Sequence, residues 1–212
     1  MTGRIQIDLF TTLDLVAQAP GNPDEDRDGG FPFGGWQAPL FDDVVGQNVG
    51  AAISGLDALL LGRKTYDIFA AYWPNHTDGV DGAIGRQFDR VPKYVASRGT
   101  PALDWQGTTQ LGPDLAAELS ELRERHENIH VIGSVDFVQT LLADRLYDEL
   151  GLWVYPIVLG QGKKVFPDGA VPANLELLAP PLVSANGAVL LRYGPQPGVP
   201  ATGDFDTLDR EA

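Results

Sequence analysis

The sequence has no cysteine, which excludes disulfide bridges, thiolate zinc sites and a cysteine nucleophile. Its three histidines are scattered and form no HExxH-type spacing, so we expect no metal site. Basic residues are scarce as well: 15 Lys and Arg stand against 29 Asp and Glu, for a net charge of -14. Because this overall field repels nucleic acids and anionic membranes, we expect neither as a partner.

Long apolar runs are also absent, and no segment approaches the length needed to span a bilayer. The chain opens directly on a strand-like segment without a charged and then apolar leader, which predicts a cytoplasmic protein. The length of 212 residues suits one globular domain, which we place over residues 1–194. Residues 195–212 hold Pro, Gly and acids without periodicity, which predicts a flexible tail.

The most informative segment is LDALLLGRKTYDIF. Its apolar run is too short for a helix and ends at Gly62, which predicts a buried strand that turns directly into a helix. A helix start offers unpaired N–H groups and partial positive charge, and Arg63, Lys64 and Thr65 add two cations and a hydroxyl. The junction therefore suits a phosphate, although the same residues could simply solvate a loop and cap a helix.

Two further junctions have the same character. The segment KYVAS reads as a second buried strand, and Ser97 and Arg98 at its end again supply a hydroxyl and a cation. The segment IHVI reads as a third strand, which ends at Gly133, and Ser134 is a natural N-cap for a helix from Val135. Three strand ends thus carry groups suited to binding phosphate.

The order of elements predicts the fold class. Residues 4–10 alternate apolar and polar side chains as a strand does, and apolar positions three or four apart predict an amphipathic helix over 39–56. Consecutive strands fill the last third, at 147–159, 175–178 and 188–193. Strand–helix alternation followed by consecutive strands predicts an α/β protein with a mostly parallel sheet and antiparallel C-terminal strands. This β-rich last third also favours a homodimer that pairs through strands.

Residues 19–36 form a long loop with five glycines, three prolines and four acids. Loops of this length in compact domains are usually functional or disordered. The embedded aromatics favour a lid, in which Phe31, Phe33 and Trp36 would form an aromatic wall for a flat substrate, with Phe33 and Trp36 named as substrate-binding residues. The alternatives are an acidic surface insert and a local cluster of packed aromatics.

The chain resembles the dihydrofolate reductase-like superfamily, specifically stand-alone relatives of the reductase domain of the bacterial riboflavin deaminase-reductase (the RibD C-terminal domain). The resemblance covers roughly residues 4–194 and implies a three-layer αβα sandwich. Its motifs share their order with that family: Thr12-Leu13-Asp14, Gly34-Gly35-Trp36, Leu61-Gly62-Arg63-Lys64-Thr65-Tyr66, Ser97-Arg98, Val131-Ile132-Gly133-Ser134 and Leu159-Gly160-Gln161-Gly162-Lys163.

The resemblance implies NADPH as cofactor. Helix-start N–H groups would hold the pyrophosphate, Arg63 would lie near the 2′-phosphate, and Ser97 and Arg98 would favour NADPH over NADH. Ser134 stands where a second glycine is usual and would add a hydroxyl ligand. The implied cofactor-binding residues are Thr11, Thr12, Ala17, Gly62, Arg63, Lys64, Thr65, Ser97, Arg98, Gly133, Ser134 and Val135.

The implied activity is hydride transfer to a small heterocyclic or carbonyl substrate, as in 5-amino-6-(5-phosphoribosylamino)uracil reductase or dihydrofolate reductase, with no metal and no flavin. For the proton donor we name Asp14 first and Asp42 second, and either needs a pKa raised by burial. The alternatives are a turn or capping carboxylate for Asp14 and a solvated helix flank for Asp42.

The chain also departs from the family. Leu15 replaces the motif's final glycine, and the acidic loop would repel a phosphorylated substrate. A non-catalytic NADPH-binding sensor or assembly module is the alternative function. True dihydrofolate reduction is disfavoured, because the loop and the following helix present no unambiguous acid.

Overall fold

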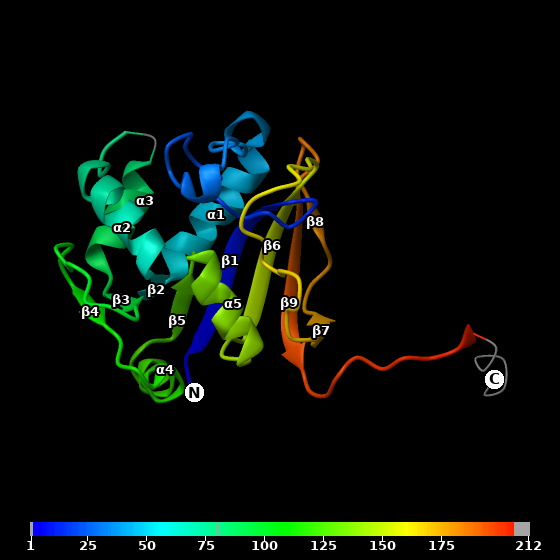
Figure 1. Cartoon of the computed structure of the whole chain (residues 1–212). Helices are drawn as coiled ribbons and strands as arrows, with labels where there is room; N and C mark the ends of the chain where they lie inside the picture. The colour runs from blue at the N-terminus through cyan, green and yellow to red at the C-terminus, as the bar shows by residue number, and fades with distance from the viewer. Residues whose placement is uncertain (1, 80, 206–212) are drawn as a thin grey trace.

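The computed structural model describes residues 2–79 and 81–205. Among these residues, nine strands form one sheet in the order β4-β3-β2-β5-β1-β6-β9-β7, with β8 paired to β9 (Figure 1). The strands are β1 (Arg4–Thr12), β2 (Ala58–Gly62), β3 (Lys93–Ala96), β4 (Thr108–Gln110), β5 (Asn128–Val131), β6 (Glu149–Tyr155), β7 (Asn174–Leu177), β8 (Leu182–Val183) and β9 (Val189–Gln196). The α-helices are α1 (Asp43–Gly55), α2 (Arg63–Tyr72), α3 (Gly82–Arg90), α4 (Leu115–Arg125) and α5 (Val135–Ala143), and short 3-10 turns lie at Asp28–Gly30, Ala38–Leu40 and Trp73–Asn75.

The pairing directions confirm the predicted sheet. Strand β1 runs parallel to β5 and β6, β2 is parallel to β3 and β5, and β3 is parallel to β4. Strand β9 is antiparallel to β6, β7 and β8. It continues to Gln196, past the predicted domain end at residue 194, and residues 206–212 of the predicted tail lie outside the described residues.

Two layers of helix enclose the sheet, so the predicted three-layer architecture is confirmed. On one face, Ile5 and Ile7 of β1 pack in one cluster with apolar residues of α4 and α5. On the other face, Leu59 and Leu61 of β2 pack with residues of α1, α2 and α3. Strand β2 is buried along its whole length, as expected for a central parallel strand, and each fully buried Leu contributes about 1.5–3 kcal/mol.

The topology indicates the edge of the sheet at which a ligand would bind. The connection from β1 through α1 to β2 and the connection from β5 through α5 to β6 leave the sheet on opposite faces. In open α/β sheets, ligands bind outside the carboxyl ends of the strands where such connections diverge. In Figure 1 the loop after β1 and the loop after β6 both lie at this edge. No helix in the described part of the chain is long and apolar enough to cross a bilayer.

Candidate active site

Two glycines bring the carboxyl ends of β2 and β5 into contact. Gly62 donates its N–H to the carbonyl of Gly133 at 2.9 Å. A Cβ added to Gly62 would lie 2.8 Å from the backbone nitrogen of Ser134, and one added to Gly133 would lie 2.5 Å from Oγ1 of Thr65. Gly133 also has a φ of +143°, which favours glycine. Two of the predicted cofactor segments, at the starts of α2 and α5, therefore meet at one point.

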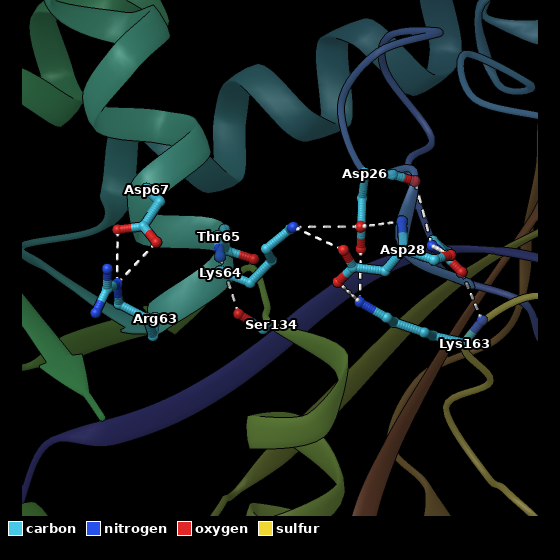
Figure 2. Close-up of polar contacts among 9 residues, drawn as sticks. Asp26, Asp28, Arg63, Lys64, Thr65, Asp67, Ser134 and Lys163 are labelled. Atoms are coloured by element: carbon cyan, nitrogen blue, oxygen red, sulfur yellow. Dashed lines mark hydrogen bonds and ion pairs between the residues drawn. The ribbon is translucent and has the colours of Figure 1, made fainter. Parts of the chain in front are cut away.

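Ser134 connects these two helix starts. It occupies the N-cap position of α5, as predicted, but its side chain does not cap that helix. Its Oγ instead accepts the N–H of Thr65 at 2.9 Å, which Figure 2 shows. The hydroxyl thus satisfies one of the N–H groups that the start of α2 leaves without a helical partner.

The predicted phosphate-binding cations differ in whether they already form ion pairs within the protein. Nε of Arg63 donates to both carboxylate oxygens of Asp67, at 2.8 and 2.7 Å, so a 2′-phosphate contact by Arg63 would have to open this pair. Nζ of Lys64 lies 3.1 Å from Oδ1 of Asp28 in the acidic loop. Arg98 is exposed just past β3, and its side chain has no partner among residues 2–79 and 81–205. Of these three predicted cations, Arg98 is therefore the most available to an added phosphate.

The other predicted cofactor residues are mostly buried. Thr11 and Thr12 are fully buried, and both hydroxyls donate within the protein, one to a β6 carbonyl and one to a carboxylate. Ala17 and Val135 are each 8% exposed. The Ser97 hydroxyl accepts a backbone N–H two residues on. These residues shape the site through backbone and packing, and their side chains offer few free donors.

Asp14 ties the end of β1 to the loop after β6. One carboxylate oxygen accepts the Thr12 hydroxyl at 2.6 Å and the Leu159 N–H at 3.2 Å, and the other accepts the Gly160 N–H at 2.8 Å. Burial alone would raise the pKa of Asp14, but these hydrogen bonds outweigh it and lower the pKa. The raised pKa predicted for a proton donor is wrong here, because the donors all favour the charged form.

Asp42 is the N-cap of α1, which begins at Asp43 and not at Pro39. Its carboxylate accepts the N–H of Val45 at 3.0 Å and that of Asn186 at 2.9 Å. These bonds lower the pKa of Asp42, so the raised pKa expected for this carboxyl is also wrong. The carboxylate fixes the helix start against the turn before β9.

The acidic loop packs onto the molecule through its aromatics. Trp36 is 8% exposed and donates its indole N–H to the carbonyl of Gln18 at 2.8 Å, so it belongs to the core. Phe33 is 41% exposed and packs edge-on against Phe31. Of the three aromatics predicted to form the wall, Phe31 lines a cavity of about 260 Å³, and Phe33 and Trp36 are not part of its lining. The cavity lining consists of Gln18, Asp28, Gly29, Phe31, Gln161, Gly162 and Lys163.

The family model described as RibD C-terminal domain matches residues 4–181 of the chain. The chain belongs to this family. The uncharacterized protein YyaP of Bacillus subtilis is 27% identical to this RibD C-terminal domain over 128 residues, which are 59% of this chain and 68% of YyaP.

Solved structures share the fold. A Shewanella sp. PV-4 protein named for riboflavin biosynthesis superposes with a TM-score of 0.69 at 18% identity, over 92% of this chain and 99% of that one. The Thermotoga maritima diaminohydroxyphosphoribosylaminopyrimidine deaminase/5-amino-6-(5-phosphoribosylamino)uracil reductase gives a TM-score of 0.59 at 16% identity, over 92% of this chain and 57% of that one.

Sequence reasoning missed three side chains that line the cavity of this RibD C-terminal domain, Gln18, Asp28 and Lys163, and also Asp26, which pairs with Lys163. In the sequence, Asp26 and Asp28 stand out only as part of an acidic stretch. A signal was available, since a cation directly follows the Gly-Gln-Gly motif and could have been matched with the acidic loop. The residues just after the motif pair with the segment after β1, through an antiparallel bridge between Val16 and Lys164.

Proposed function

We propose that the protein is an NADPH-dependent oxidoreductase that transfers a hydride to a small heterocyclic or carbonyl substrate. The observation that carries the proposal is the contact of Gly62 with the Gly133–Ser134 segment beside the start of α2. A side chain at either glycine would collide with the neighbouring segment, so the two helix starts lie close enough together to offer their backbone N–H groups to one pyrophosphate. Family membership supports it, and one relative of this fold carries the name of a uracil reductase.

The residues present fit the cofactor. The start of α2 offers backbone N–H groups and a positive helix end to a pyrophosphate. Arg98, without a partner among the described residues, would bind the 2′-phosphate as a charge-assisted donor. NADPH, when bound, supplies the hydride. The segment after β1 and the loop carrying Lys163 border the cavity and would orient a substrate there, and buried Phe31 gives the cavity an apolar surface.

Water is the proton source in this proposal. Asp14 and Asp42 both have lowered pKa values, and hydrogen bonds from Lys163 and then Lys64 lower the pKa of Asp28 to about 2. All three carboxyls are therefore ionised near neutral pH and hold no proton to donate. Hydride transfer with solvent protonation then needs only alignment of the two reactants.

The first test is a titration with NADPH and NADH, followed by intrinsic tryptophan fluorescence and thermal shift. We expect Arg98→Ala to weaken NADPH binding by about 10–100-fold, since a hydrogen bond to a charged group is worth about 1.5–3 kcal/mol. NADH binding should change little. Arg90→Ala is the matched control, because Arg90 is an exposed arginine that precedes β3 and so lies at the opposite edge of the sheet.

Equal losses for both cofactors would contradict the 2′-phosphate assignment, and no binding of either would overturn the proposal. An NADPH oxidation assay with a panel of small carbonyl and heterocyclic compounds then separates an enzyme from a sensor. A sensor binds NADPH and does not turn it over.

A further inference from the structure

Four charged side chains form a closed cluster over the carboxyl edge of the sheet (Figure 2). Nζ of Lys163 lies 2.8 Å from Oδ2 of Asp26 and 2.8 Å from Oδ2 of Asp28. Nζ of Lys64 lies 3.1 Å from Oδ1 of Asp28 and 3.5 Å from Oδ1 of Asp26. Each carboxylate thus faces both ammonium groups, and the two carboxylates balance the two positive charges.

The buried side chain of Gln18 holds the backbone that carries the two carboxylates. The side-chain amide of Gln18, a residue that is 3% exposed, donates to the carbonyls of Asp26 at 3.2 Å and Asp28 at 3.0 Å. Asp26 also accepts the N–H of Asp28 at 3.0 Å, and its side chain is only 8% exposed. A carboxylate this deeply buried is costly unless paired, so Lys163 and the loop stabilise each other.

The cluster forms one wall of the 260 Å³ cavity. Asp28 and Lys163 both line it, and the Asp28 side chain is 52% exposed. A phosphate entering this cavity would meet the Asp28 carboxylate first and would have to compete with it for Lys163. Phe31 offers an apolar surface on the same lining. The lining therefore suits a neutral, partly apolar group and opposes a dianion.

We infer that Asp26 and Asp28 are specificity-determining residues that occupy Lys163, the lysine of the cavity lining, as a built-in anion, and so restrict the substrate to compounds without a phosphate group. This inference rests on the proposed reductase function, because it names the substrate class of that site.

The test uses ribose 5-phosphate as the probe and ribose as the neutral reference, with binding to the cofactor-free protein measured by calorimetry. Asp28→Asn keeps the size of the side chain and removes one negative charge. We expect Asp28→Asn to strengthen ribose 5-phosphate binding by at least about tenfold. This is the scale of effect expected when one negative charge that repels the phosphate is removed from a partly exposed contact. Adding Lys163→Met should abolish this gain. Ribose binding should not respond to either change.

Asp24→Asn is the matched control. Asp24 lies in the same loop and pairs with Arg27, its side chain is 72% exposed, and the substitution changes the net charge by the same amount. It should leave ribose 5-phosphate binding unchanged. Thermal unfolding of every variant verifies that the loop change has not unfolded the chain.

Three results would overturn the inference. The first is that the wild-type protein binds ribose 5-phosphate through Lys163 as tightly as Asp28→Asn does. The second is that Asp28→Asn binds ribose 5-phosphate no more tightly than the wild type. The third is that the tighter binding of Asp28→Asn persists when Lys163→Met is added. A gain that survives would place the anion elsewhere, at the start of α2 or at Arg98. Calorimetry with ribose 5-phosphate uses the protein without cofactor, so its result does not depend on the NADPH titration. Failure of the proposed reductase function would appear in the NADPH titration and the oxidation assay instead.

Discussion

Replacing Ser134 by Ala tests whether the hydroxyl at the helix junction is a ligand of the cofactor. In the structure the Ser134 oxygen accepts the Thr65 N–H at 2.9 Å, and its own proton has no acceptor among the described residues. Because an accepted hydrogen bond polarises the hydroxyl, we expect this proton to be donated to a pyrophosphate oxygen. The substitution removes that donor and keeps Cβ, so the contact with Gly62 is preserved.

The size of the effect follows from this geometry. A hydrogen bond to a charged group contributes about 1.5–3 kcal/mol, and the freed Thr65 N–H can recover part of this by binding the ligand or water. A net loss of about 1–2 kcal/mol remains, which weakens NADPH binding by about 5–30-fold. NADH should weaken by the same factor, since both dinucleotides carry the pyrophosphate.

The assay is an equilibrium titration with both cofactors, alongside thermal unfolding without ligand. Ser54→Ala is the matched control, because Ser54 is exposed on α1 and donates only to a carbonyl of its own helix. Unchanged or tighter binding in Ser134→Ala would refute the reasoning. It would mean that Thr65 is the phosphate donor and that the hydroxyl obstructs it.

Two further predictions concern buried charge and the end of β1. Burial lowers the pKa of Lys93, which is 0% exposed, from 10.5 to about 8. The folded chain then binds fewer protons than the unfolded chain between about pH 8 and 10.5, so its stability should rise across this range by up to ~3 kcal/mol relative to Lys93→Met. Urea unfolding of both proteins at several pH values checks this, and parallel curves would contradict it. Asp14→Asn should lower the free energy of unfolding by about 1–3 kcal/mol, because an amide hydrogen would face the Gly160 N–H. The same substitution should lower Tm by about 2–12 °C. Lost turnover at an unchanged Tm would instead indicate a catalytic role.

Local patterns were sufficient for most of the fold. The run ending at Gly62 predicted β2 and α2, because a short apolar segment followed by glycine and helix-forming residues fixes both elements within a few positions. Strands β4 and β8, with three and two residues, were missed because they are too short to show a period. The predicted motifs at Gly62 and Gly133 do meet, since both follow neighbouring parallel strands.

The site was less predictable, because its partners are distant in sequence. The pKa of Asp14 is lowered first by the nearby Thr12 hydroxyl and then by the N–H of Gly160, which is 146 residues away. The Lys163 ammonium binds Asp26 across 137 residues. Neither pairing leaves a local pattern, and composition alone presented the acidic loop as a general repulsive field. The structure shows that field to be partly neutralised by specific contacts.

The same separation has a consequence for how the molecule assembles. Lys163 follows β6, and β6 reaches its place beside β1 only after the chain has passed through β2, β3 and β5. Contacts between residues far apart in sequence carry the largest loop-closure cost and form late. The cavity wall made by Asp28 and Lys163 is therefore among the last parts of the protein to form, after the sheet that supports it. A nascent chain holds its acidic loop without the Lys163 counter-charge until the final third has been synthesised.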